Sequence, residues 1–229
     1  MTTTGMWVIF IVIMILSWVV GAVLKSKFKK YSKIPVDNGM SGREVAERML
    51  RDNGIYDVKV ESVQGFLSDH YNPEKKSINL SPEVYSGRSI SAAAVAAHET
   101  GHAIQHATSY AWLGFRSKMV PAVSFSSKWV TWILLAGMLL VNTFPGLLLA
   151  GIVLFALTTL FSFITLPVEI NASQRALAWL STAGITSYQN HPQAEDALKW
   201  AASTYVVAAL GSLATLLYYV MIFMGARDE

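Results

Sequence analysis

Long uncharged apolar runs and one polar stretch alternate along the chain. The run at 5–24 has twenty uncharged residues, about the number that a helix needs to cross a ~30 Å hydrocarbon core. The run at 129–168 has forty uncharged residues and is interrupted by NTFPG at 142–146. Forty helical residues extend about 60 Å, so this pattern predicts two crossings joined by a tight turn. The uncharged residues at 200–226 predict a fourth crossing.

The polar stretch, residues 31–110, has the composition of a small folded domain. Within it, 56–63 and 76–81 alternate apolar and polar residues as strands do. The turn-forming sequence DHYNPEKK at 69–76 lies between them. We therefore expect a short β-hairpin made of these two strands.

Two helices are expected in the same stretch. Ser41 and Glu44 of SGRE have the capping-box spacing that opens a helix, which the sequence DNG then ends. Residues 89–107 are rich in alanine, a strong helix former, and Ser89 or Ser91 can cap their start. We therefore expect a mostly α membrane protein with four transmembrane helices and a small α+β domain. The alternative is a soluble protein, but a globular domain of this size could not bury so many long uncharged helices.

Composition also favours a membrane protein, because 53% of the residues are hydrophobic and only 14% are charged, against about 25% charged in soluble domains. Cysteine is absent. This absence excludes a disulfide framework, a thiolate metal site and a cysteine nucleophile. Any metal ion must therefore take histidine and carboxylate ligands.

Basic residues are concentrated after the first apolar run. Twelve of the eighteen Lys and Arg residues lie between Lys25 and Arg88, and none precedes the run. A secretory signal has the opposite order, so 5–24 is expected to remain as an anchor. The positive-inside rule predicts an outside N-terminus and a cytoplasmic polar domain in a bacterial-type cytoplasmic membrane. We interpret the charge as orientation and contact with the lipid bilayer, not as nucleic-acid binding.

The sequence AAHETGHAIQH at 96–106 contains the pattern H-E-x-x-H, formed by His98, Glu99 and His102. Residues i and i+4 share a helix face, so the two imidazoles can reach one Zn²⁺ at about 2.0–2.1 Å. Glu99 then flanks the metal without binding it and can act as the general base of peptide hydrolysis. The alternative is an ordinary surface helix, which the many alanines around the motif disfavour.

A catalytic zinc site usually has three protein ligands. His106 lies eight residues from His98, about 12 Å along a helix axis, which is too far to share the ion. The metzincin pattern needs a third histidine at the position of Thr108. Glu169 is the better candidate, because a carboxylate at the end of an uncharged run needs water or a cation. Counting the spans places Glu169 on the same cytoplasmic side as the motif.

Together with LPVEINASQRA at 166–176 and the four hydrophobic spans, the motif at 96–106 resembles the YugP-type zinc-dependent membrane peptidases of bacteria. The resemblance covers nearly the whole chain. More distantly, the pairing of the two motifs is similar to the membrane gluzincins of the HtpX and CaaX-protease type. The resemblance implies that His98, His102 and Glu169 bind zinc, that Glu99 is the general base, and that the substrate is a protein or peptide.

One position departs from the HtpX-like pattern. Ser173 stands four residues after Glu169, where that pattern has aspartate, and Asn171 lies nearby. The aspartate is expected to accept a hydrogen bond from a ligand histidine, which a neutral Ser or Asn does less strongly. This departure affects the hydrogen bonds that orient the ligand residues more than the identity of the ligand residues.

A peptidase also needs a donor for the oxyanion that forms on the attacked carbonyl. Tyr205, at the cytoplasmic mouth of the fourth crossing, is the preferred candidate. His191, His70 and Tyr71 are the remaining residues of suitable chemistry. The strand at 76–81 could hold an extended substrate along its edge.

These expectations divide the chain into five segments and favour a zinc-dependent membrane metalloendopeptidase. A non-catalytic scaffold or regulator with a structural zinc is the alternative. An ion transporter is disfavoured, because the histidines lie outside every uncharged run. The segments are 1–24, the transmembrane anchor; 25–118, a cytoplasmic zincin-like region; 119–168, a transmembrane helical hairpin; 169–199, a cytoplasmic segment with the third ligand; and 200–229, the fourth transmembrane helix and tail.

Overall fold

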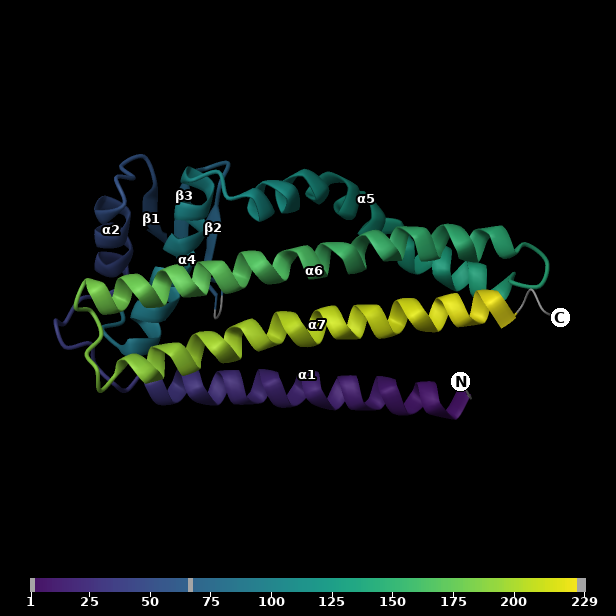
Figure 1. The fold of residues 1–229 in the computed structure, drawn as a ribbon, viewed down its shortest axis with the longest axis horizontal. Helices are drawn as coiled ribbons and strands as arrows, with labels where there is room; N and C mark the ends of the chain where they lie inside the picture. Colours follow the sequence, from purple (N-terminus) through teal and green to yellow (C-terminus); the bar gives the residue numbers. More distant parts are fainter. Residues whose placement is uncertain (1–2, 66–67, 226–229) are drawn as a thin grey trace. The chain divides into compact units, whose positions relative to one another are not determined.

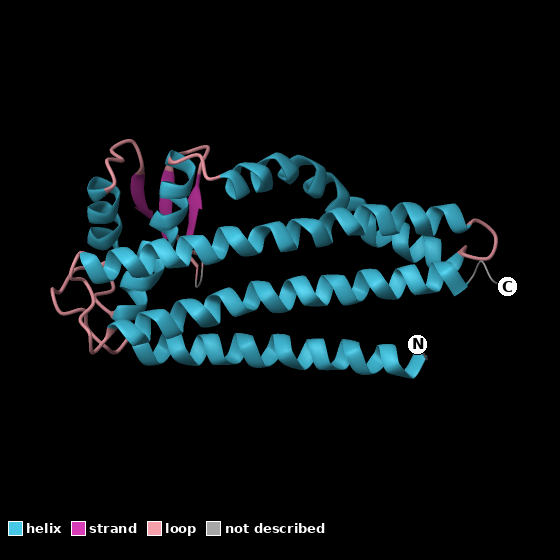
Figure 2. Cartoon of the chain, viewed as in Figure 1, coloured by secondary structure: helices cyan, strands magenta, loops and turns pink. Residues whose placement is uncertain are grey.

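The computed structural model describes residues 3–65 and 68–225 (Figure 1). Figure 2 shows that helices dominate the chain and that the strands form one small sheet. The elements in chain order are α1 (Thr3–Tyr31), α2 (Gly42–Asp52), β1 (Lys59–Ser62), β2 (His70–Asn72), β3 (Ser77–Leu80), α3 (Pro82–Tyr85), α4 (Ile90–Ala107), α5 (Ala111–Leu139), α6 (Pro145–Thr182) and α7 (His191–Gly225).

Four of the described helices are long and apolar enough to cross a membrane: α1 from Trp7 onward, α5, α6 and α7. Only 6% of the most apolar part of α1 is buried within the protein, and the same holds for α7. Surfaces this apolar and this exposed suit contact with lipid rather than water. The expected fold class, a mostly α membrane protein with four spanning helices and a small sheet, is confirmed.

The chain forms two compact units, and α1, α5, α6 and α7 each contribute residues to both. The first unit contains Met1–Val19, Phe115–Leu166 and Thr204–Glu229. Inside it, Ser126 Oγ of α5 donates a hydrogen bond to the Leu154 carbonyl of α6 at 2.8 Å. Such a bond is expected between apolar helices, because a hydroxyl without water needs a partner on a neighbouring helix.

The second unit contains Val20–Gly114 and Pro167–Ser203 and holds the polar domain. Its core lies around α4, which is buried along most of its length. Helix α2 packs against α4, and strands β2 and β3 contact α4 as well. Apolar residues from the ends of α6 and α7 that belong to this unit, such as Leu180 and Leu198, complete the same core. A helix rich in alanine suits this position, because small side chains allow close packing on several sides.

Both helix starts in the polar domain have the expected caps. Ser41 and Glu44 form the complete capping box at the start of α2, and Asn53 ends that helix. Ser89 caps α4 by accepting a hydrogen bond from the backbone N–H of Ala92 at 3.3 Å. Of the two serines that could cap α4, the structure therefore uses Ser89.

The expected hairpin between 56–63 and 76–81 is wrong in its pairing. Strand β1 pairs with β3 in parallel, and the hairpin partner of β3 is β2, which lies inside the stretch expected to be only a turn. Only three residues of that stretch form the strand, too few for an alternating pattern to reveal. The sheet order is β1-β3-β2, so the KSINLS strand is central and offers no free edge to a substrate.

Candidate metal centre

The motif residues lie in the middle of α4, with the two histidines one helical turn apart. The rings of His98 and His102 are 4.8 Å apart between centroids and meet edge to face. Glu99 follows His98 on the same helix and is 8% exposed. Residues four apart lie above one another on a helix, so both imidazoles point in the same direction.

Glu169 of α6 meets these histidines from the facing helix. Its Oε2 atom lies 3.3 Å from Nε2 of His98 and 3.5 Å from Nε2 of His102. One ligand atom from each of the three residues lies within 4.8 Å of the other two. Glu169 is 3% exposed, so its carboxylate faces the histidines with little access to water. The structure thus brings together the three residues that the sequence suggested as metal ligands.

The spacing of these atoms fits a tetrahedral zinc ion. With zinc bonds of about 2.1 Å to imidazole nitrogen and carboxylate oxygen, neighbouring ligand atoms of a tetrahedron are about 3.4 Å apart. Both carboxylate-to-imidazole distances, 3.3 and 3.5 Å, agree with this separation. Two nitrogens and one oxygen are also the donor set of a catalytic zinc site with one open position.

The charged surroundings alter the pKa of His102, one of the candidate ligands. Burial of His102 by itself lowers the pKa of its imidazole, but contact with Glu169 and the negative charges of Glu99 and Glu169 raise it by more. The net pKa lies above the usual histidine value. The buried carboxylates therefore favour positive charge at this point of the structure.

Gly101 allows α4 and α6 to approach at the cluster. A Cβ atom at position 101 would lie 2.7 Å from the carbonyl oxygen of Ala172 and 3.1 Å from its Cα atom. Both are backbone atoms of α6, so they cannot move aside as a side chain can. Gly101 lies between the two histidines of the motif, and Ala172 lies three residues after Glu169. This contact sets the distance between the two halves of the cluster.

Replacing Gly101 by alanine is therefore expected to separate the helices. We expect a stability loss of about 1–3 kcal/mol from overpacking and at least a tenfold loss of zinc affinity, as typical for a displaced ligand. Gly114→Ala is the matched control, because a Cβ there meets nothing within 4 Å among the described residues. Thermal unfolding and chelator competition in detergent measure both effects. Equal behaviour of the two variants would contradict the role of the contact.

Each of the two histidines has a hydrogen-bonding partner on its Nδ1 atom. His98 Nδ1 lies 3.1 Å from the Ser173 hydroxyl. Serine therefore contacts this histidine from the position at which the HtpX-like pattern has aspartate. His102 Nδ1 lies 3.0 Å from Oε1 of Gln105. Gln105 was not predicted from the sequence, although its place three residues after His102 puts it on the same side of the helix. Such partners orient ligand imidazoles.

Comparison with known proteins assigns the chain to a family. Residues 6–224 match the family described as "Putative neutral zinc metallopeptidase". The chain belongs to this family. It is also 48% identical, over 206 residues, to the "Putative membrane protease YugP" of Bacillus subtilis (strain 168), covering 90% of this chain and 91% of that protein. No solved structure matches the chain.

The other candidate residues of this zinc metallopeptidase family member lie elsewhere. His106 is exposed, and its Nδ1 lies 3.1 Å from the Tyr71 hydroxyl. His70 contacts the Ser68 carbonyl at 2.8 Å and His191 the Thr186 hydroxyl at 2.8 Å. Each of these histidines thus contacts a group outside the ligand cluster.

Tyr205 belongs to α7 in the first unit and is 38% exposed. The ligand cluster belongs to the second unit. The role of Tyr205 as an oxyanion donor therefore stays a prediction.

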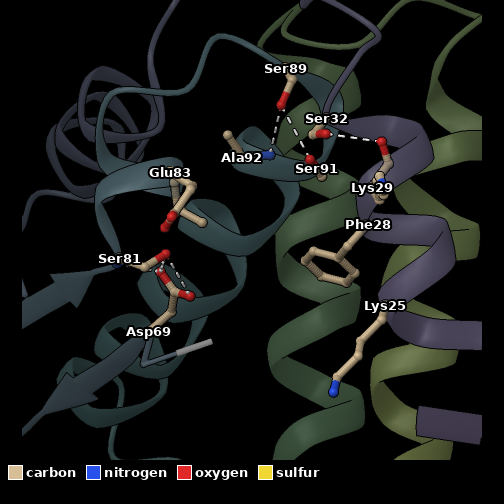
Figure 3. Close-up of a pocket in the computed structure, with 11 residues that line it drawn as sticks. Lys25, Phe28, Lys29, Ser32, Asp69, Ser81, Glu83, Ser89, Ser91 and Ala92 are labelled. Atoms are coloured by element: carbon tan, nitrogen blue, oxygen red, sulfur yellow. Dashed lines mark hydrogen bonds between the residues drawn. The ribbon is translucent and has the colours of Figure 1, made fainter. Parts of the chain in front are cut away.

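A pocket of about 330 Å³ lies beside the start of α4 (Figure 3). Lys25 and Lys29 of α1 stand on one side of it, and Asp69 and Glu83 stand on the other. Asp69 accepts hydrogen bonds from the backbone N–H and the hydroxyl of Ser81, which fix its orientation. Because Asp69 directly precedes β2, the pocket adjoins one end of this strand.

Proposed function

We propose that the protein is a zinc-dependent endopeptidase of the gluzincin type, anchored in a cytoplasmic membrane. The cluster of His98, His102 and Glu169, with Glu99 beside it on α4, is the observation that carries this proposal. Family membership and the YugP relative support a zinc protease. The specific roles of the residues and the class of substrate are our inference.

In this proposal His98, His102 and Glu169 hold the ion. When bound, zinc supplies a Lewis acid that polarises the substrate carbonyl and makes water more acidic. Glu99 takes the proton from the attacking water and delivers it to the nitrogen of the leaving amine. The burial of Glu99 favours this proton transfer, because a carboxylate with little water around it interacts more strongly with nearby charge. With three protein ligands, a bound zinc would keep one position for the reacting group.

Strand β2 is our candidate for holding the substrate. It is an edge strand of the described sheet, and it contacts the motif helix α4. An extended peptide adds to such an edge through backbone hydrogen bonds, which do not depend on its sequence. The pocket beside Asp69 at the start of β2 could accept one substrate side chain. A protein or peptide substrate is therefore consistent with the surroundings of the cluster.

For the membrane arrangement, we propose an outside N-terminus and a cytoplasmic active site. The five lysines that follow the first span, from Lys25 to Lys33, support this orientation. The bilayer itself is then the first partner of the protein, and membrane proteins are accessible substrates. Cleavage would take place at the cytoplasmic face.

Metal analysis and a cleavage assay on purified wild type test the proposal. We expect one zinc ion per chain and hydrolysis of casein or a labelled peptide. Chelation should stop hydrolysis, and added zinc should restore it. Bound zinc without hydrolysis would instead support the second candidate, a scaffold with a structural zinc. The set of three candidate ligands among the described residues favours the peptidase, because a structural zinc usually has four protein ligands.

A further inference from the structure

Gln105 lies where α4 meets α6 and contacts both sides of the ligand cluster. Its side chain is fully buried, with 0% exposure. Its Oε1 atom lies 3.0 Å from His102 Nδ1, and its Nε2 atom donates to the Val168 carbonyl at 2.8 Å. Val168 immediately precedes Glu169. One amide therefore joins one candidate ligand to the backbone beside another.

The orientation of this amide is determined by its neighbours. The Val168 carbonyl can only accept, so the atom facing it must be the NH₂ group of Gln105. The same NH₂ group donates to Asn171 Oδ1 at 3.0 Å, and Arg175 Nε donates to that oxygen at 2.8 Å. Arginine has no acceptor, so Asn171 must present its oxygen. Two independent partners thus fix which end of Gln105 faces His102.

This orientation determines the tautomer of His102. The Gln105 oxygen can only accept, so Nδ1 of His102 must carry the proton. Metal binding requires the neutral ring, in which Nε2 is then an acceptor, and this atom faces Oε2 of Glu169 at 3.5 Å. Two acceptors at this separation are stabilised by a cation between them. The Ser173 hydroxyl next to His98 can donate or accept, so it imposes no such choice.

We propose that Gln105 is the positioning residue that prepares His102 for the metal. It fixes the ring as the Nδ1–H tautomer and couples its position to that of Glu169. The inference rests on the proposed function only in taking zinc as the occupant of the cluster. Gln105 thus holds His102 and Glu169 in place as a pair of ligands. The hydroxyl of Ser173 fixes no tautomer of His98, so this ring keeps more freedom to orient toward the ion.

Zinc affinity tests the proposal independently of peptide cleavage. Gln105→Leu removes the acceptor and the donor, and we expect zinc affinity in a chelator competition to fall about 10- to 100-fold. Thr100→Val is the matched control, because Thr100 is equally buried on α4 and bonds only to the Ala96 carbonyl of its own helix among the described residues. We expect this control to stay within threefold of wild type.

A second measurement reports on the tautomer itself. In the cobalt-substituted protein, each ligand imidazole with a free N–H gives a shifted, exchangeable proton signal. Gln105→Leu should lose the protected signal of His102, whereas Ser173→Ala should lose that of His98. Gln105→Glu keeps an acceptor oxygen for Nδ1, so it should retain the His102 signal, although its second oxygen cannot replace the donor to the Val168 carbonyl. This variant also serves if Gln105→Leu fails to fold.

The proposal is overturned if Gln105→Leu binds zinc as tightly as Thr100→Val, or if both protected signals persist in it. A wild type that binds no zinc would overturn this proposal and the proposed function together. A wild type that binds zinc without cleaving any peptide overturns the proposed function alone, because neither readout involves hydrolysis.

Discussion

Glu99→Gln is expected to abolish peptide cleavage while leaving zinc bound at wild-type stoichiometry. Glutamine keeps the shape of the side chain but cannot take a proton from water, and a positioned general base contributes about 10²–10⁴-fold to rate. Glu99 directly follows His98 on α4 and is not one of the three residues whose candidate ligand atoms lie together. Metal content and initial cleavage rates of the purified variant give the two numbers.

The matched control for this change is Glu74→Gln, an exposed carboxylate in the turn between β2 and β3. We expect this control to cleave at the wild-type rate. Cleavage by Glu99→Gln at more than a tenth of the wild-type rate would remove Glu99 from the mechanism. Loss of zinc from Glu99→Gln would instead show that it supports the metal and not only the reaction.

Glu169→Gln is expected to lose the zinc itself. A neutral amide is a poor zinc ligand, and two imidazoles alone do not complete a site. Affinity should fall by more than about 100-fold, beyond the range for residues that only support a ligand. Chelator competition measures this loss, and cleavage should disappear with the metal.

Glu195→Gln on α7 controls for removing a carboxylate from a long helix, because the side chain of Glu195 is 44% exposed and pairs with Lys199 at 2.7 Å. It should bind zinc as the wild type does. Wild-type zinc affinity in Glu169→Gln would exclude Glu169 as the third ligand. The expected results distinguish the roles of Glu99 and Glu169. Glu99→Gln should keep the metal without activity, and Glu169→Gln should lose both.

The sequence predicted features that depend on short-range spacing or on chain topology. His98 and His102 share a helix face because they are four residues apart, and counting spans placed Glu169 on their side. The close approach of Gly101 to Ala172, in contrast, became apparent only in the structure. The spans were evident because uncharged residues run on for longer than any buried core helix requires.

Other features could not be predicted because they depend on contacts between distant residues. The parallel pairing of β1 with β3 is not encoded in the alternation of either strand, and β2 is too short to show one. Gln105 gave no signal because a lone amide fits many roles, and its partners near 168 and 171 are more than sixty positions away. Only the folded structure shows that it faces a ligand.

The contact between Gly101 and Ala172 has a consequence for the choice of ion. Because Gly101 has no Cβ, the backbones of α4 and α6 come close together beside the three donor side chains. Calcium requires six to eight oxygens at about 2.3–2.6 Å, and the donors here are too few and too closely held for it. The absence of a Cβ at Gly101 thus lets three donors from two helices lie close enough together to suit a small ion with few ligands.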